Sequence, residues 1–294
     1  MKLKRVKENP VLTPRENVDW EKDAVFNSGV YYEKGTFYLL YRAVAHREDD
    51  PNRSSIGYAW SEDGINFKRK DQPVLRPGVV AEESQGVEDP RITKIDDKYH
   101  MFYTAYDNEK ARIARAESEN LLDWERRGIV FPWGQFGDNK DAALFSEKIN
   151  DRYVLLHRPV PDIYLSFSDD LENWTDHQCI MEPTFDWESK KIGTGAQPIK
   201  TEAGWLLVYH GVDRDSVYRL GIALLDLENP SQVIKRQSEP ILEPETEWEL
   251  QGDVNNVVFT CGAVLVDGQL WVYYGGADTV IGLARAPIAD FLKK

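Results

Sequence analysis

Cysteine is scarce in this chain, with only Cys179 and Cys261 among 294 residues. Two cysteines so far apart give neither a disulfide framework nor the paired spacing of a zinc site. None of the five histidines belongs to a metal-ligand motif either. We therefore expect two buried, reduced thiols in a cytoplasmic protein, with no metal and no other cofactor.

Long apolar runs and an excess of positive charge are also absent. No stretch approaches the roughly 20 apolar residues that a membrane helix needs, and the first ten residues, MKLKRVKENP, lack the apolar core of a signal peptide. The formal net charge of −14 argues against nucleic acid and anionic membranes as partners. Any site that binds an anion must therefore be a local cluster of cations.

A six-residue motif that ends in proline recurs along the chain. Its clearest copies are NPVLTP (9–14), QPVLRP (72–77) and EPILEP (239–244), and two degenerate copies are RGIVFP (127–132) and QCIMEP (178–183). Five copies separated by about 50–60 residues predict a repeat architecture.

Each repeat also contains a β-hairpin and a third strand. A tight polar turn precedes each of five strand-like stretches: FYLLYRA (37–43), YHMFYTA (99–105), YVLLHRP (153–159), WLLVYHG (205–211) and LWVYYGG (270–276). With the proline motif as a fourth strand, the unit has four antiparallel strands. Five such units predict an all-β fold, a five-bladed β-propeller that forms a single catalytic domain over residues 1–294.

The two ends of the chain are predicted to meet in the last blade. The fifth repeat stops after its third strand, and NPVLTP has no hairpin before it. We therefore expect residues 9–14 to pair with residues 279–286 as the outer strand that closes the last blade.

Charged residues gather at one position of the repeat, near the end of the second strand. This position holds Arg42, Thr104, Arg158, His210 and Gly275. Reflection across each hairpin turn places about Asn27, Asp89, Ala143, Gln197 and Thr260 opposite them. Lys140 and Asp141 lie just before Ala143, and Asp278 follows the last second strand.

The repeats therefore differ most where they face one point on a rim. The predicted rim carries Asn27, Arg42, Asp89, Lys140, Asp141, Arg158, His210 and Asp278. Asp89 precedes a proline, so it is either a turn-capping residue or a general acid. Cations that face one carboxylic acid indicate a phosphate site with a proton donor.

Several motifs resemble glycoside hydrolase family 130, which consists mainly of mannoside phosphorylases on a five-bladed propeller. The resemblance covers nearly the whole chain. It rests on QGVEDPRI (85–92), NKDAALF (139–145), LHRP (156–159), KIGTGAQPIKTEAGWLLVYHGVD (191–213) and GDVNNVVFTCGAVLVDGQLWVYYGGADT (252–279).

The resemblance implies roles for the rim residues. Asp89 would be the general acid, and Lys140, Arg158 and His210 would bind phosphate. The contacts to the reacting mannose would be Asn27, Arg42, Asp141 and Asp278. The implied reaction is inverting phosphorolysis of a β-mannosidic bond in a manno-oligosaccharide, with inorganic phosphate as co-substrate and α-mannose 1-phosphate as product. No metal is implied.

Three alternatives stay open at this point. A β-mannosidase of the same family would use water, although hydrolases of the family lack the cationic set. A five-bladed furanosidase would need a carboxylate base where this chain has Asn27. A non-catalytic sugar-binding propeller would bury cations without purpose.

The sequence leaves three properties undetermined. The linkage, β-1,2 or β-1,4, and the acceptor sugar depend on loops such as residues 45–54 and 132–140. The oligomeric state is open as well, a homo-oligomer included.

Overall fold

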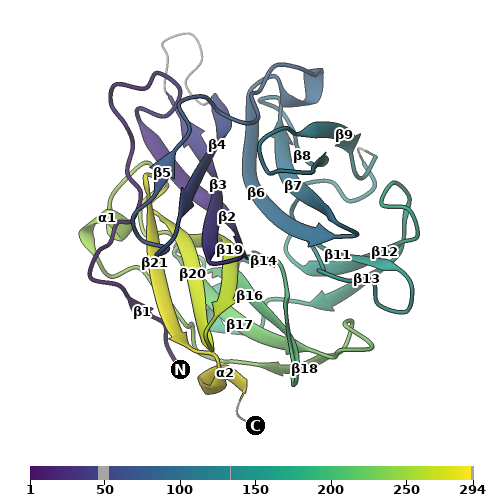
Figure 1. Cartoon of the computed structure of the whole chain (residues 1–294). Helices are drawn as coiled ribbons and strands as arrows, with labels where there is room; N and C mark the ends of the chain where they lie inside the picture. Colours follow the sequence, from purple (N-terminus) through teal and green to yellow (C-terminus); the bar gives the residue numbers. More distant parts are fainter. Residues whose placement is uncertain (46–52, 133, 293–294) are drawn as a thin grey trace.

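The computed structural model describes residues 1–45, 53–132 and 134–292, and its strands form four separate sheets (Figure 1). The all-β prediction is confirmed. Helical structure in these ranges is limited to four short pieces: η1 (Ala81–Glu83), η2 (Asp186–Glu188), α1 (Glu247–Leu250) and α2 (Ala289–Leu292). None of the described helices is long and apolar enough to cross a membrane.

The strands fall into five antiparallel units, one for each repeat. Unit 1 comprises β2 (Ala24–Glu33), β3 (Thr36–Val44), β4 (Ser54–Ser61) and β5 (Lys68–Arg69). Unit 2 comprises β6 (Gly86–Ile95), β7 (Lys98–Tyr106), β8 (Ala111–Ser118) and β9 (Glu125–Ile129). These two units share a sheet through one parallel pair, Ser54 with Gly86.

Unit 3 comprises β10 (Asn139–Leu144), β11 (Tyr153–Pro159), β12 (Ile163–Ser168) and β13 (Trp174–Met181). Unit 4 comprises β14 (Lys191–Thr194), β15 (Ile199–Thr201), β16 (Gly204–Val212), β17 (Tyr218–Leu225) and β18 (Val233–Arg236). Its first strand is split, because β14 and β15 both pair with β16. Unit 5 comprises β19 (Val258–Val266), β20 (Gln269–Gly276), β21 (Val280–Pro287) and the N-terminal β1 (Lys4–Arg5).

The proline motif has the same structural role in every unit. Its fourth residue bonds to the start of the third strand of a unit. The five pairs are Leu12 with Ile281, Leu75 with Ile56, Val130 with Ile113, Met181 with Ile163, and Leu242 with Leu220. The repeated motif therefore marks the outer edge of each unit.

The N-terminal segment completes unit 5, as predicted, and its pairing extends further than predicted. Leu12 forms the expected bridge with Ile281, and backbone hydrogen bonds join the same two residues. A regular strand forms earlier, where Lys4 pairs with Arg285 and Arg5 with Ala284. In Figure 1 the purple N-terminal segment lies beside the yellow β21.

Apolar side chains pack between consecutive units. Each of the five large hydrophobic clusters of the described chain joins two neighbouring units, and one of them joins unit 5 back to unit 1. In that cluster Val264 and Tyr273 of unit 5 meet Val30 and Leu39 of unit 1. No described sheet closes on itself, so the closed propeller stays a prediction.

A buried Tyr–Glu–Arg anchor recurs in four units. A tyrosine of the second strand donates to a glutamate that precedes the first strand, and an arginine of the outer strand binds the same glutamate. The four sets are Tyr41–Glu21–Arg69, Tyr103–Glu83–Arg126, Tyr209–Glu188–Arg236 and Tyr274–Glu249–Arg5. Each anchor fixes the segment that enters its unit, and unit 3 has a different arrangement.

Parts of the loops that we assigned to acceptor choice lie outside the described residues. These are residues 46–52 of the segment 45–54 and residue 133 of the segment 132–140. The C-terminal helix α2 ends at Leu292, and residues 293–294 lie outside the described range.

We predict that Leu12→Ala lowers the free energy of unfolding by about 2–4 kcal/mol. Leu12 is 4% exposed and belongs to the cluster between units 5 and 1, so the substitution leaves a cavity at that interface. Urea unfolding followed by circular dichroism measures the change. Val79→Ala, at a 64% exposed position, is the control and should change stability by less than about 0.5 kcal/mol. Equal stability of the two variants would show that the N-terminal segment does not hold the last unit.

Candidate active site

Backbone bulges present the predicted site residues at the ends of the first strands. The strand register shifts between Phe26 and Gly29 in β2, between Glu88 and Arg91 in β6, and between Lys140 and Ala143 in β10. Asn27, Asp89 and Asp141 lie inside these bulges with φ of +47°, +50° and +61°. Asparagine and aspartate tolerate this left-handed region better than most residues. The bulges therefore turn three polar side chains toward one place.

The acid side of the site is centred on Asp89, which is 2% exposed. Asn27 Nδ2 donates to Asp89 Oδ1 at 2.9 Å, and Arg42 Nη1 lies 3.5 Å from the same oxygen. Arg42 Nη2 also donates to Glu88 Oε1 at 2.8 Å, where the Ser54 hydroxyl donates at 3.3 Å. The carboxyl group of Asp89 is therefore held in place by unit 1.

The cationic side is centred on Asp141, which is 1% exposed. Arg158 Nε donates to Asp141 Oδ2 at 3.1 Å, Arg91 Nη2 lies 3.4 Å from Oδ1, and His210 Nε2 lies 3.7 Å from Oδ2. Burial alone would raise the pKa of Asp141, but Arg158, Arg91, His210 and Lys140 hold it well below its usual range. Asp141 is therefore ionised and is the shared counter-ion of the cationic side.

Arg91 connects two units of the site through hydrogen bonds to backbone carbonyls. It is 2% exposed and donates to three backbone carbonyls: those of Gly195 at 2.6 Å, Thr194 at 2.8 Å and Asp89 at 3.1 Å. The side chain thus joins the bulge of unit 2 to the split first strand of unit 4.

His210 is packed tightly against the split strand. A Cβ on Gly193 would lie 2.4 Å from His210 Cε1 and 2.7 Å from Asp141 Oδ2, so only glycine fits there. Burial lowers the pKa of His210 well below its ordinary value, and repulsion by Arg158, Lys191 and Arg91 adds to this despite the attraction of Asp141. His210 is therefore a neutral imidazole in this arrangement.

Two lysines complete the cationic side. Burial lowers the pKa of Lys140, but the attraction of Asp141, Asp89 and Glu88 more than compensates, so the pKa lies above its ordinary value. For Lys191, burial together with repulsion by Arg158 and Lys140 lowers the pKa to about 8. Lys191 Nζ also lies over the Tyr218 ring, 5.5 Å from its centroid. Lys140 is thus firmly charged, and an anion would favour the charged form of Lys191.

Asp278 lies on the acid side and is a second carboxyl group that can be protonated. It follows β20 with φ of +54°. Burial raises its pKa from the ordinary 3.8 to about 7; Arg42 and Lys140 oppose this rise, and Asp89 and Asp253 add to it. Asp278 is therefore electrostatically coupled to the same groups that surround Asp89.

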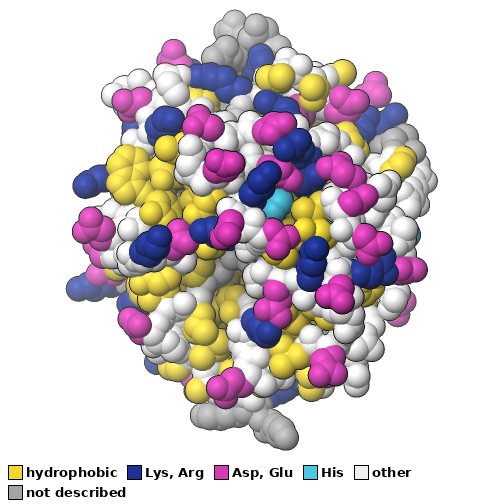
Figure 2. Space-filling view, turned by 45° about the vertical axis from the view of Figure 1, so that its right-hand side comes forward, with side chains coloured by type: hydrophobic (Ala, Val, Ile, Leu, Met, Phe, Trp, Pro, Cys, Tyr) yellow, Lys and Arg dark blue, Asp and Glu magenta, His cyan; other side chains and the backbone are white. Residues whose placement is uncertain are grey.

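Several buried polar atoms in the site have no hydrogen-bond partner within the described part of the chain. They include Asn27 Oδ1, Arg42 Nε, Arg158 Nη1 and His210 Nδ1. Unpaired buried polar groups are costly unless another molecule satisfies them. Figure 2 shows that basic and acidic side chains gather around a histidine near the middle of the drawn face. The arrangement can therefore bind a polar, partly anionic ligand.

The structure brings all eight predicted rim residues into one cluster, although the simple reflection was wrong at two positions. Arg158 lies opposite Lys140 and not Ala143, and His210 lies opposite Gly193 and not Gln197. Arg42, Thr104 and Gly275 lie opposite Phe26, Glu88 and Phe259, each one residue from the reflected position. The bulge in β10 adds one residue to its strand, and the break between β14 and β15 adds two, so the register is displaced at both places. The roles of the eight residues stay predictions.

Sequence reasoning missed Arg91 and Lys191 as members of the cluster. Both lie inside motifs that we quoted, VEDPR and KIGTG, but neither occupies the strand end that the reflection examined. A search for further cations within these quoted motifs would have found both.

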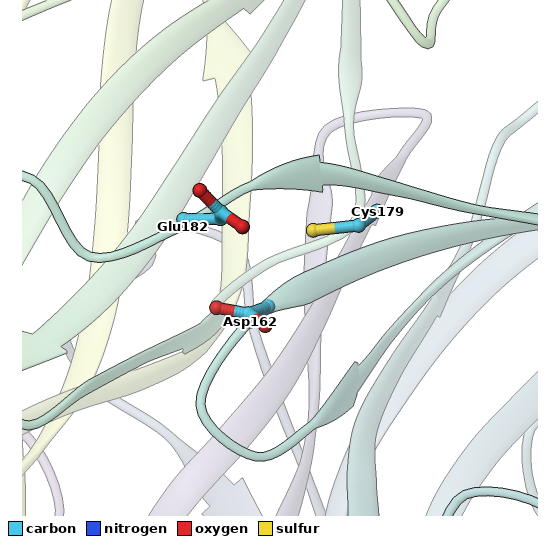
Figure 3. A group of neighbouring side chains, drawn as sticks. All are labelled: Asp162, Cys179 and Glu182. Atoms are coloured by element: carbon cyan, nitrogen blue, oxygen red, sulfur yellow. The ribbon is translucent and has the colours of Figure 1, made fainter.

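A group of potential metal ligands that is not part of the predicted rim lies on unit 3. Figure 3 shows Asp162, Cys179 and Glu182, whose ligand atoms lie within 4.8 Å of one another. Burial, Asp162 and Glu182 raise the pKa of the Cys179 thiol, which keeps it protonated and makes it a poor ligand. Cys179 and Glu182 are exposed, and no metal site follows from this group. The prediction of two buried thiols is therefore wrong for Cys179, which lies on the outer strand β13, and is confirmed for Cys261.

Known proteins resemble this chain over its full length. The family model of glycoside hydrolase family 130, described as beta-1,4-mannooligosaccharide phosphorylase, matches residues 2–294. A 1,2-beta-oligomannan phosphorylase from Thermoanaerobacter sp. (strain X514) is 51% identical over 99% of both chains. A beta-1,2-mannobiose phosphorylase from the same organism is 54% identical over 96% of both chains. The structure of a beta-1,2-mannobiose phosphorylase from Listeria innocua, in complex with beta-1,2-mannobiose, superimposes with a TM-score of 0.89 at 31% identity and covers 99% of this chain and 98% of that chain.

We predict that Asp278→Asn stabilises the protein at pH 8 and that this gain disappears toward pH 4. The folded pKa of Asp278 is about 7 and the ordinary value is 3.8. Between these values unfolding releases a proton, so Asp278 lowers stability as pH rises, and the loss is complete above pH 7. The asparagine variant avoids this loss, which is on the order of 2–4 kcal/mol.

Thermal unfolding of wild type and Asp278→Asn across this pH range measures the difference. Asp19→Asn, at an exposed position, is the control and should show no such pH-dependent gain. A constant difference between Asp278→Asn and wild type at all pH values would contradict the burial of a protonated carboxyl group.

Proposed function

The chain belongs to glycoside hydrolase family 130, and we propose on this basis that it is an inverting β-mannoside phosphorylase. It cleaves a β-mannosidic bond of a manno-oligosaccharide with inorganic phosphate and gives α-mannose 1-phosphate and a shortened acceptor. The observation that carries this proposal is the convergence of Lys140, Arg158, Lys191 and His210 around Asp141, next to the carboxyl group of Asp89.

Phosphate binding is the task of the cationic side. Arg158 Nη1 and His210 Nδ1 are buried nitrogens without a hydrogen-bond partner in the described chain. Charge-assisted hydrogen bonds from Arg158 and Lys140 would hold the phosphate oxygens, and the neutral imidazole of His210 would add a hydrogen bond. Lys191 contributes more strongly when it is protonated, which a bound dianion favours.

Proton delivery is the task of the acid side. Asp89 supplies a proton toward the leaving oxygen while phosphate attacks the opposite face of the anomeric carbon, so the configuration is inverted. The bond between the anomeric carbon and the leaving oxygen breaks, and a bond to a phosphate oxygen forms. Asn27 and Arg42 fix Asp89, and together with Asp141 and Asp278 they are placed to contact the mannose. No metal or other cofactor is needed for these steps.

We infer that the five units are the five blades of a propeller that forms one catalytic domain. The apolar clusters between consecutive units, and the return contact of unit 5 to unit 1, support this arrangement. The first strands of neighbouring units also pack on one another, β19 with β2, β2 with β6 and β6 with β10. This packing would bring all the strand ends that bear site residues to one rim.

For the linkage we propose β-1,2. The two relatives that are 51% and 54% identical to this chain are named for β-1,2-linked substrates, whereas the description of the family model names β-1,4. The two relatives are individual proteins that share about half of their residues with this chain, and they therefore carry more weight than the description of a whole family. Assays of β-1,2- and β-1,4-mannobiose, with the product anomer read by NMR, test the linkage.

The water-using alternative makes a different demand on the same site. A hydrolase needs a base that activates water, and neutral water gains little from Lys140 and Arg158. A furanosidase is disfavoured because Asn27, an amide, occupies the place of its carboxylate base. A binding protein without catalysis would gather these buried cations at a cost in stability and without a reaction to use them.

We predict that Asp89→Asn lowers turnover of mannobiose by about 10²–10⁴-fold while phosphate still binds. The asparagine keeps the shape of the side chain but cannot supply the proton. A mannoside with a strongly acidic leaving group needs less protonation and should lose less activity. Steady-state kinetics with both substrates and calorimetry with phosphate measure these effects. Wild-type turnover in the variant would remove Asp89 from the role of acid.

We predict that Arg158→Gln raises the Michaelis constant for phosphate by about 10- to 100-fold. A charge-assisted hydrogen bond contributes on the order of 1.5–3 kcal/mol, and 1.4 kcal/mol corresponds to a factor of ten. The Michaelis constant for the mannoside should change much less. Wild-type turnover should also collapse in phosphate-free buffer. Equal rates with and without phosphate would reject the phosphorylase and favour the hydrolase.

A further inference from the structure

Unit 3 replaces every member of the Tyr–Glu–Arg anchor. At the tyrosine position, one residue before Arg158, it has His157. In units 1, 2 and 4 the glutamate lies five residues before the register partner of the second-strand end, and in unit 3 Gln135 occupies this position. On the outer strand His177 takes the place of the arginine. On the third strand Ser166 takes the place of an alanine, which is Ala59, Ala116, Ala223 or Ala284 in the other units.

The replacements form a continuous hydrogen-bonded chain. Asn139 Oδ1 lies 3.1 Å from His157 Nδ1, and Ser166 Oγ lies 2.7 Å from both His157 Nε2 and His177 Nδ1. At the outer end His177 Nε2 lies 2.9 Å from Gln135 Nε2. His157 and Ser166 are fully buried.

The hydrogen bonds of this series have one consistent order of donors and acceptors when both histidines are neutral. The amide oxygen of Asn139 can only accept, so His157 Nδ1 donates to it and His157 Nε2 accepts from the Ser166 hydroxyl. Ser166 Oγ then accepts from His177 Nδ1, and His177 Nε2 accepts from the Gln135 amide. Burial lowers the pKa of His157 to about 3, and burial also lowers the pKa of His177, so both rings are neutral at pH 7.

Aromatic packing reinforces the same contacts. The Phe136 ring centroid lies 5.0 Å from that of His157 and 4.9 Å from that of His177, and the Phe131 ring lies 4.6 Å from His157. Gln135, Phe136 and Asn139 all belong to the segment that enters unit 3. The chain and the rings therefore fasten this segment to β11, β12 and β13.

Two residues of the hydrogen-bonded series directly precede the cations that we propose to bind phosphate. Asn139 precedes Lys140 on β10, and His157 precedes Arg158 on β11; Lys140 and Arg158 are register partners. Successive residues of a strand point to opposite faces, so the chain holds these two strands from the face opposite the site.

We propose that His157, Ser166 and His177 are positioning residues that set Lys140, Asp141 and Arg158 for phosphate. This inference rests on the proposed phosphorylase function. The hydrogen-bonded chain takes over the task that the Tyr–Glu–Arg anchors perform in the other units. It does so with neutral groups. A carboxylate at this place would attract Lys140 and Arg158 away from phosphate.

The test compares the phosphate affinity of variants with substitutions in the hydrogen-bonded series. His177→Leu removes the donor at Nδ1 and leaves the Ser166 oxygen without it, whereas His177→Asn keeps an amide N–H near the position of Nδ1. Ser166→Ala breaks the chain at its centre. Ser168→Ala is the matched control, because it removes turn hydrogen bonds with Asp170 and Leu171 at the other end of the same strand.

Calorimetric titration with inorganic phosphate, together with kinetics at saturating mannobiose, gives the readout. We expect His177→Leu and Ser166→Ala to raise the dissociation and Michaelis constants for phosphate about tenfold, with kcat within about threefold of wild type. His177→Asn should recover most of the affinity. Ser168→Ala should lower the melting temperature without changing the affinity.

Two results would overturn the proposal, and they are distinguishable. If wild type binds phosphate and both His177→Leu and Ser166→Ala bind it equally well, the chain is only a structural anchor. If wild type binds no phosphate, the proposed function fails together with the positioning role. If Ser166→Ala does not fold, the comparison of His177→Leu with His177→Asn still tests the proposal, because His177 is only half-buried.

Discussion

One buried carboxylate, Asp141, makes the cationic half of this site possible. Isolated charges are expensive to bury, and the site gathers cations from units 2, 3 and 4. Asp141 stays ionised and contacts Arg158, Arg91 and His210 at once. One negative charge does not neutralise Arg91, Arg158, Lys140 and Lys191 together. The remaining positive charge gives an anion a local attraction, which the net charge of −14 opposes at longer range.

The position of Asp141 depends in turn on how the strands are bent. A regular strand would send alternate side chains to opposite faces. The bulges interrupt this alternation where Asn27, Asp89 and Asp141 occur, and the left-handed backbone at each bulge suits their residue types. Aspartate and asparagine at these positions therefore serve the backbone as well as the chemistry, and the capping role first considered for Asp89 does not compete with the role of an acid.

Much of the fold could be predicted from the repeated proline motif, because its fourth residue makes the same edge contact in all five units. The site could be predicted because the repeats differ at one strand end. The register could not be predicted at Ala143 and Gln197, since neither the bulge in β10 nor the break between β14 and β15 leaves a clear signal in a single sequence. The strand at Lys4–Arg5 was missed because KR is neither apolar nor alternating. Arg91 was missed because its importance comes from backbone carbonyls of unit 4, about 100 residues away.

Comparison of the units with one another separates two kinds of variation. At the rim every unit differs, because each contributes a different group to one asymmetric ligand. In the buried layer behind the rim, four units keep the Tyr–Glu–Arg anchor. Side chains in this layer do not contact the ligand, so ligand binding alone gives no reason for them to differ between units. Unit 3 nevertheless exchanges tyrosine, glutamate, arginine and alanine together for His157, Gln135, His177 and Ser166. Single replacements would leave a buried polar group unpaired, so the exchange is stable only as a set. It occurs in the unit that places Lys140, Asp141 and Arg158, which links the composition of the buried layer to the chemistry at the rim.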